Sequence, residues 1–370
     1  MHTNRVTTVL CGALIGVLFF GCSRTPEERF THAVEKYNRK QDAESRLVIE
    51  NNFLTDLQAV KLNAHDDYLP GVNAIILKDG DISTVITSDG YSEPWNENIR
   101  FAHYDPATST LCISDGFSAE FFTFSTDEDG TDHISREREL YLTKDDETAI
   151  DSMYIFDDTL FFYYKRQLHA INLVSENKKI VSRKDGKEIT AGPPYDKFAF
   201  KVYMAVDGTH VALAVGDAGM YSLYVFDHVQ SVLVFQKKVP SRFFSLNGDR
   251  ISYLAGKTGN WQVNRIDLGS TTEKTIRSFS TLRDIAVSTD RIFYVDQDGY
   301  HITDPDFLLD YAENPMAKID RIVNDYLVIE FRGEHYFVST PLYFTITNRY
   351  ESLVPNFFKH NPGLTADDLK

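Results

Sequence analysis

The chain has 370 residues, of which 42% are hydrophobic and 25% are charged. This composition is ordinary for a globular protein and excludes a disordered one. The formal net charge of −16 at pH 7 argues against binding to a nucleic-acid backbone, which needs clustered Lys and Arg. We therefore expect no nucleic-acid partner and interpret the acidic balance as a source of solubility.

The first residues have the pattern of an export signal. Arg5 precedes an apolar run from Val6 to Phe20, which suits a secretory signal and is shorter than the ~20 residues of a membrane-spanning helix. Gly21 and Cys22 follow directly, and then the polar stretch SRTPEE. The placement of Gly and Cys after the run resembles a bacterial lipoprotein signal.

That resemblance implies a signal peptide over 1–21 and a Cys22 that carries lipid such as palmitate. The lipid would tether the chain to a membrane of the bacterial cell envelope, with the protein periplasmic or surface-exposed. Phe19 departs from the pattern, because Leu is more usual there. An ordinary cleaved signal and an uncleaved anchor are the alternatives. With Cys22 acylated, Cys112 has no disulfide partner, and we expect it to be a small buried apolar residue.

Residues 22–56 are expected to form the lipid anchor, a linker and a helical neck. Thr25 can cap a helix, Pro26 suits its first position and Glu28 completes a capping box. One apolar stripe at helical spacing follows, with charged residues through Arg46: Phe30, Ala33, Val34 and Tyr37. We expect this helix to dock on the main domain through the stripe, and a partner-binding helix is the alternative.

One pattern recurs through 57–350, and it is clearest between Arg242 and Asp304. Each copy has an apolar run, a turn with Asp, an apolar strand, a Gly turn and a second strand ending in Asp. Aligned first apolar residues lie 35 to 51 residues apart by subtraction, at Leu111, Leu160, Val211, Ile251, Ile292 and Leu327. An earlier copy begins at Val72. A repeat of short strands at this spacing is typical of a β-propeller.

The predicted fold is therefore all-β, a seven-bladed β-propeller over 57–350, with six blades as the chief rival. A two-sheet sandwich is a further alternative. Outermost strands are expected at 231–236 (SVLVFQ) and 343–348 (YFTITN), with no useful helix after Asn52 and a polar tail over 351–370. The polar residues that close the second strands are expected to accept hydrogen bonds from backbone amides of the next turn: Asp89, Asp127, Asn172, Asp227, Asp267 and Asp304.

Three segments carry a family resemblance. GNWQVNRIDL at 259–268 and GMYSLYVFDH at 219–228 resemble the repeat of TolB-like propellers, where a Gly turn precedes a strand that ends in Asp. RQLHAINLVSENKKIV at 166–181 is similar to blades of quinoprotein-like and assembly-lipoprotein propellers. The resemblance implies a propeller that serves as a docking surface in the cell envelope, and it carries over no functional residue.

The chain offers no local catalytic signature, so we expect no catalytic residue and no cofactor. It has no G-x-S-x-G, H-E-x-x-H or C-x-x-C motif. His169 and His210 lie in strand-like runs and are interpreted as packed or turn-edge residues. The best metal candidate is a Ca²⁺ site at Asp127, Asp129 and Asp132, for which a solvated acidic hairpin is the favoured alternative.

The sequence thus favours a monomeric, membrane-anchored binding scaffold whose partner is an envelope protein or glycan. A glycan hydrolase or lyase with paired carboxylates at the channel mouth is the competing hypothesis. A small-ligand-binding propeller is a third. Positions that occur in only one copy are weak candidates for a binding face: Lys257, Asn260, Trp261 and His301.

Overall fold

The structure is a computed structural model of the whole chain. It describes residues 25–355 except 63–67, 80–81, 96–97, 128–131, 144–147, 193–200, 218–219, 258, 281–283, 288–291, 296–299, 304–307, 312–316 and 324–325. Cys22 and the end of the predicted tail lie outside this range. No helix among the described residues is long and apolar enough to cross a membrane.

The described residues form seven four-stranded antiparallel sheets, which we number blades 1 to 7 in chain order. In blades 1 to 3 the strands follow one another along the chain: β2 (Tyr68–Pro70), β3 (Ala74–Asp79), β4 (Ile82–Thr87) and β5 (Ser92–Trp95); β6 (Phe101–Asp105), β7 (Thr110–Ser114), β8 (Ser118–Thr126) and β9 (Asp132–Tyr141); β10 (Ser152–Phe156), β11 (Thr159–Tyr164), β12 (Gln167–Asn172) and β13 (Lys178–Ile180).

A two-stranded hairpin separates blade 3 from blades 4 to 6, which have the same strand order. The hairpin pairs β14 (Arg183–Lys184) with β15 (Lys187–Glu188). The three blades are β16 (Lys201–Asp207), β17 (His210–Asp217), β18 (Met220–Asp227) and β19 (Val232–Val239); β20 (Phe244–Asn247), β21 (Arg250–Lys257), β22 (Asn260–Asp267) and β23 (Glu273–Phe279); β24 (Asp284–Val287), β25 (Ile292–Val295), β26 (Tyr300–Thr303) and β27 (Leu308–Tyr311).

Blade 7 is completed by both ends of the chain. Its strands β28 (Ala317–Val323), β29 (Tyr326–Phe331) and β30 (Glu334–Ser339) come from the C-terminal part. The fourth, β1 (Val60–Leu62), comes from the N-terminal part and pairs antiparallel with β30. The predicted outermost strand at 343–348 is therefore wrong, because β1 occupies that place in the sheet.

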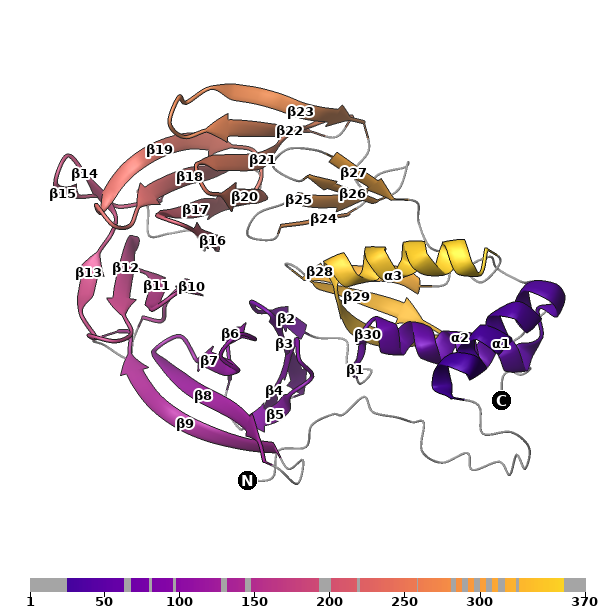
Figure 1. Cartoon of the computed structure of the whole chain (residues 1–370). Coiled ribbons are helices and arrows are strands. Elements are labelled where there is room, and N and C mark those ends of the chain that lie inside the picture. Colours follow the sequence, from indigo (N-terminus) through magenta and orange to yellow (C-terminus); the bar gives the residue numbers. More distant parts are fainter. Residues whose placement is uncertain are drawn as a thin grey trace.

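The alternating side chains of each strand fill the contacts with the blades on both sides. Successive residues of a strand point to opposite faces, and in β17 Val211 and Leu213 pack toward blade 3 while Ala212 and Ala214 pack toward blade 5. Blades 1, 2 and 3 alternate in the same way. First strands of successive blades are neighbours, such as β6 with β10, β10 with β16 and β24 with β28. The blades stand around a common centre (Figure 1), so the chain is an all-β propeller, as the sequence predicts.

The predicted neck is two helices, α1 (Pro26–Lys40) and α2 (Ala43–Asp56). The capping box at Thr25 and Glu28 is present, with Thr25 Oγ1 accepting from the Glu28 amide at 3.2 Å. The chain does not continue as one helix through Arg46. Gln41 takes a left-handed conformation and ends α1, and Asp42 caps α2 by accepting from the Ser45 amide.

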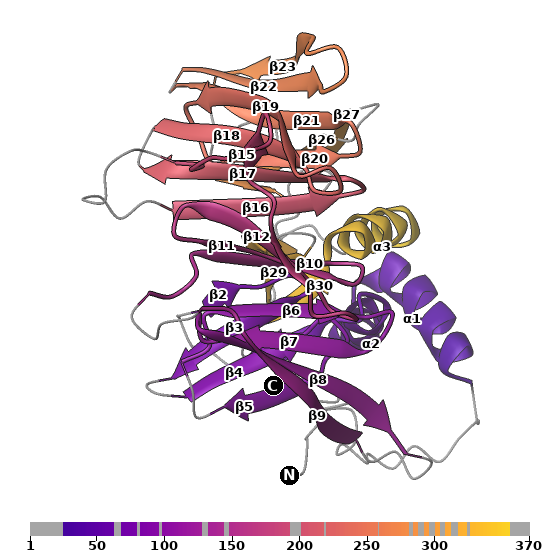
Figure 2. The ribbon, with the colours of Figure 1, turned by 90° about the vertical axis from the view of Figure 1, so that its left-hand side faces the viewer.

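A third helix, α3 (Thr340–Leu353), follows blade 7 directly. The expectation of no helix after Asn52 is therefore wrong. Proline lies in its first turn, where a missing N–H costs nothing. Tyr343, Thr347 and Tyr350 recur at helical spacing and are buried. Figures 1 and 2 show the three helices together at one side of the ring, beside blade 7.

The helices cover one face of blade 7. Leu327, Ile329 and Phe331 of β29 pack on them, while Val328 points to the opposite face and packs toward blade 1. The predicted stripe of α1 takes part, since Ala33 and Tyr37 are buried and Phe30 and Val34 pack against the same cluster. The helical residues therefore pack on the face of blade 7 opposite to the one that meets blade 1.

A buried ion network also joins α2 to blade 7. Arg46 Nε lies 2.9 Å from Glu50 Oε1, and Arg332, in the turn between β29 and β30, contacts Glu50 Oε2. Glu50 is 1% exposed. Two guanidinium groups therefore neutralise one carboxylate that has no access to water, and either arginine alone would leave a weaker network.

Candidate ligand pocket at the closure of the ring

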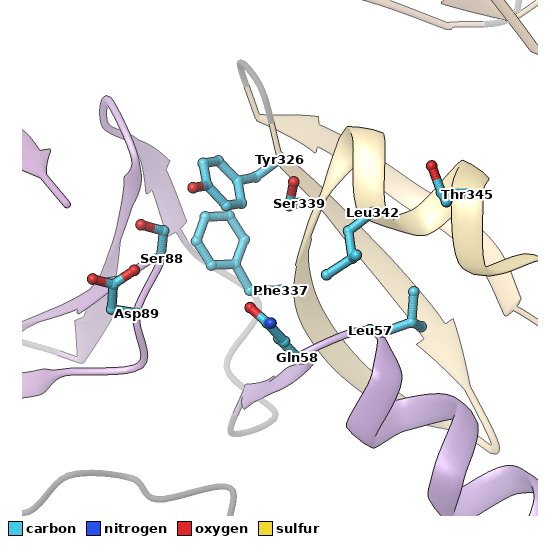
Figure 3. Close-up of a pocket in the computed structure, with 9 residues that line it drawn as sticks. All are labelled: Leu57, Gln58, Ser88, Asp89, Tyr326, Phe337, Ser339, Leu342 and Thr345. Carbon is cyan, nitrogen blue, oxygen red and sulfur yellow. The ribbon is translucent and has the colours of Figure 1, made fainter. Parts of the chain in front are cut away.

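A cavity of about 440 Å³ lies where blade 7, blade 1 and the helices meet (Figure 3). Its lining comes from segments that are distant in sequence: the end of α2, the β4–β5 turn, β29, β30 and α3. Nine residues form it, namely Leu57, Gln58, Ser88, Asp89, Tyr326, Phe337, Ser339, Leu342 and Thr345. The volume lies within the range of small-molecule sites.

The end of α2 places Gln58 at the pocket. The Gln58 amide donates to the Thr55 carbonyl at 3.0 Å and the Ala59 amide to the Leu54 carbonyl at 3.1 Å. This pair of bonds is the Schellman motif, whose left-handed position Gly usually fills. Gln58 occupies it with φ of 49°, so the chain holds an exposed amide side chain where glycine would be less strained.

An aromatic pair forms one side of the pocket. The rings of Tyr326 and Phe337 are stacked, with centroids 4.7 Å apart and planes 29° from parallel. Phe337 is buried and Tyr326 is half-buried. Phe337 is fixed by packing toward blade 1, next to Val328 and Ile75. The pair is therefore a rigid apolar surface that orders little on binding a ligand.

The β4–β5 turn supplies a carboxylate and a hydroxyl. Asp89 is exposed, and its Oδ2 accepts from the Tyr104 hydroxyl at 2.8 Å. This bond holds the carboxylate in place through Oδ2. Among the described residues, no hydrogen bond to Oδ1 is formed. Ser88 Oγ is buried, and within the described part of the chain it has no hydrogen-bond partner. Such a hydroxyl costs roughly 1–3 kcal/mol unless something satisfies it.

The described lining supplies groups that can bind a ligand, with one carboxylate among them. Asp89 is the one carboxylate among the nine lining residues, so the paired carboxylates of a glycosidase are not found there. Burial raises the pKa of Glu93 in β5 and of Asp151 before β10. These two acids belong to blades 1 and 3 and neither lines the pocket.

The chain is similar to known proteins in structure, at low sequence identity. No protein-family model matches the chain, and no curated protein matches it in sequence. Among solved structures, a chain of the mitotic checkpoint complex is 11% identical, with a TM-score of 0.46, covering 76% of this chain and 90% of that one. The WD40 domain of Neurospora crassa Pan2 is 10% identical, with a TM-score of 0.42 and 74% and 88% covered.

A bacterial structure is similar at the same level. A putative 6-phosphogluconolactonase of Bacteroides fragilis is 12% identical, with a TM-score of 0.37, covering 66% of this chain and 82% of that one. Identities this low show no family membership, and no ligand or activity passes from these proteins to this chain.

The acidic hairpin proposed for Ca²⁺ is only partly within the described residues. Asp127 lies at the end of β8, and its Oδ2 is 3.0 Å from Nε2 of His133. Asp129 lies outside the described residues, and of Asp132 only the backbone, in β9, is described. The described residues contain no group of three or more metal-ligating side chains. The calcium site stays a prediction.

The weak binding-face candidates are not brought together with the pocket. Lys257 and Asn260 are exposed and pair across the β21–β22 hairpin. Trp261 packs against Leu254 and Val263, next to Phe279, so it serves the core of blade 5. His301 lies in β26 of blade 6, and its side chain is outside the described residues.

The histidines and Cys112 behave as packing residues. His169 is buried and stacks on Phe162, and His210 is buried with Nδ1 3.6 Å from an Asp249 oxygen. Cys112 is a free, buried thiol whose pKa burial raises. Of the lining residues, the sequence predicted only Asp89, as a residue that closes a strand before a turn. It did not predict Gln58 and Tyr326, because ring closure alone makes them neighbours.

Proposed function

We propose that this protein is a lipid-anchored β-propeller of the bacterial cell envelope that binds a ligand in the pocket at the closure of the ring. The observation that carries the proposal is the pocket itself, where a rigid aromatic pair faces a fixed carboxylate and a buried hydroxyl without a partner among the described residues. A cavity that combines an aromatic surface with convergent polar groups is typical of a binding site.

The proposed lipid anchor at Cys22 is consistent with a binding pocket at the closure of the ring. Cys22 precedes Thr25, the cap of α1, by three residues, and three residues span at most about 11 Å. An acylated Cys22 would therefore hold the start of α1 close to the membrane. Because α1 and α2 pack on blade 7, the pocket would lie on the part of the ring that the anchor restrains.

Binding is favoured over catalysis by the single carboxylate among the described lining residues. The finer resemblance to TolB-like propellers stays a prediction, and it agrees with a docking role. The alternative of a carboxylate-pair enzyme would need a second acid near Asp89, and the described lining supplies none.

Two experiments test the proposal. The full-length chain should incorporate labelled palmitate in a bacterial host and fractionate with membranes, and Cys22→Ser should abolish both. A photoreactive residue at Thr345, which is exposed at the pocket, should crosslink an envelope component. The same residue at Val174, which is 78% exposed in blade 3, is the matched control. Equal crosslinking at both positions would contradict the proposal.

A further inference from the structure

We propose that the pocket binds one sugar unit that is neutral or carries an amino group, an inference that rests on the proposed binding function and names its ligand class. The pocket combines an aromatic surface with an amide, a carboxylate and hydroxyl groups. A sugar ring has the matching surfaces, since its C–H face is apolar and its edges are hydroxyls. Each group of the pocket can be assigned to one of these surfaces.

The aromatic pair suits the apolar face of the ring. Aromatic faces carry partial negative charge and attract polarised C–H groups. Tyr326 is half-buried over the buried Phe337, so a flat ring can lie against the pair without rearranging the core. In Figure 3 the two rings stand between the β4–β5 turn and α3.

The polar groups suit the edges of the ring. Asp89 presents an acceptor that the Tyr104 bond holds in place, and Gln58 presents an amide that both donates and accepts. Ser88 Oγ is buried without a partner in the described chain, and a ligand hydroxyl would satisfy it. A hydroxyl-rich ligand removes this desolvation cost, which a purely apolar ligand would leave in place.

The charge of the pocket sets the class of sugar. None of the nine described lining residues is Lys, Arg or His, so among them a phosphate or a uronic acid would meet no cation and would meet the carboxylate of Asp89. A ligand anion in the same pocket as the Asp89 carboxylate would be repelled by it, whereas an ammonium group would be attracted to it. We therefore expect acidic sugars to be rejected.

Gln58 gives the sharpest test because its backbone and its side chain have opposite effects. Gly at this left-handed position relieves backbone strain, so Gln58→Gly should raise Tm. The same change removes the amide and should weaken sugar binding at least fivefold. Gln41 is the matched control, since it is also left-handed at a helix end, with φ of 51°, and does not line the pocket.

The experiment uses the full-length chain in a detergent without a sugar head group. Ligand-observed NMR and calorimetry compare glucose, N-acetylglucosamine and glucosamine with glucuronate and glucose 6-phosphate. We expect saturable binding of a neutral or amino sugar, at least tenfold tighter than of either acid. Gln41→Gly should raise Tm and keep the affinity within twofold, while Ser88→Ala should fold and bind at least threefold more weakly.

Three results would overturn the inference: no saturable sugar binding by the unchanged chain, preference for an acidic sugar, or unchanged affinity in both Gln58→Gly and Ser88→Ala. Crosslinking from Thr345 separates this failure from that of the proposed function. A pocket-specific crosslink to an envelope protein, without sugar binding, would refute the sugar and keep the binding role.

Discussion

The contact between blades 3 and 4 and the contacts around blade 7 show two ways to bury the face of a propeller blade. Between blades 3 and 4, alternating strand residues such as Phe161, Leu213 and Phe226 meet in one apolar cluster. On blade 7, one face meets blade 1, and the other is covered by three helices and a buried ion network. The first contact needs only a strand pattern, and the second needs both ends of the chain.

This difference between the two kinds of contact indicates where the fold can accommodate a binding site. The regular contacts repeat and leave little room for a cavity, because protein interiors are close-packed. The pocket instead forms where helices, a turn and two blades meet with unlike shapes. The closure of the ring is therefore where the fold can acquire a specific site without disturbing the repeated blades.

The largest expected effect is at the ion network of blade 7. Glu50→Gln removes the carboxylate charge and leaves the buried guanidinium of Arg46 without its counter-charge, beside the like charge of Arg332. Breaking a buried network this way costs about 3–5 kcal/mol. Urea unfolding should show a lower midpoint with the same slope. A loss below 1 kcal/mol would show that the helices do not depend on this network.

A comparable test of the regular contact uses Leu213, which is fully buried between blades 3 and 4. Leu213→Ala should cost about 2–5 kcal/mol, from lost burial and the cavity left behind. Because no charge is involved, the loss should not change between low and high salt. A salt-dependent loss would contradict a purely apolar contact.

Acid should weaken the regular part of the ring through two buried histidines. Burial lowers the pKa of His103 to about 4, and burial together with the Lys178 charge lowers the pKa of His169 to about 4. The unfolded chain binds these protons near pH 6.5, whereas the folded chain stays neutral down to about pH 4. Stability should therefore fall as the pH drops from 6.5 to 4, by up to roughly 3 kcal/mol per histidine.

The variant His103→Asn checks this pH dependence. Its amide oxygen can still accept from the Ile155 amide, which donates to His103 Nδ1 at 3.3 Å. The loss of stability between pH 6.5 and 4 should shrink by about half relative to the unchanged chain. An identical pH profile would mean that other groups cause the acid sensitivity.

The smallest expected effect is a single hydrogen bond between α3 and α2. The Tyr350 hydroxyl donates to Asp56 Oδ2 at 2.8 Å. Tyr350→Phe keeps the ring contacts with Phe53 and Phe30, so it should cost only about 1 kcal/mol. A loss above 3 kcal/mol would show that the bond organises the helical layer.

The repeated part of the fold was predictable because each step depends on nearby residues. The alternation of apolar and polar residues predicted the strands. Three of the residues that close second strands accept hydrogen bonds from backbone amides of the following turn, as expected: Asn172, Asp227 and Asp267. The prediction failed at 343–348, where alternating aromatic and β-branched residues favour a strand. Packing against blade 7 overrides that propensity. The sequence signal that was overlooked is the proline in the first turn of α3, which favours a helix start.

The candidate site was less accessible to prediction. Gln58 precedes the first copy of the repeat, whereas Asp89 and Tyr326 lie in its first and last copies, and no spacing rule relates the three. Their proximity depends on β1 pairing with β30, which is a long-range contact that a local pattern cannot show. Only the position of Asp89 before a turn was predicted from the sequence.

The completion of blade 7 by β1 also sets the order of events in folding. Lys61 in β1 and Glu334 in β30 form an ion pair across 273 positions of the chain. Closing so long a loop carries an entropic cost and makes such contacts slow to form. During synthesis β1 emerges first and must wait for nearly the whole chain, so the ring is completed last and the pocket comes into existence only at that final step.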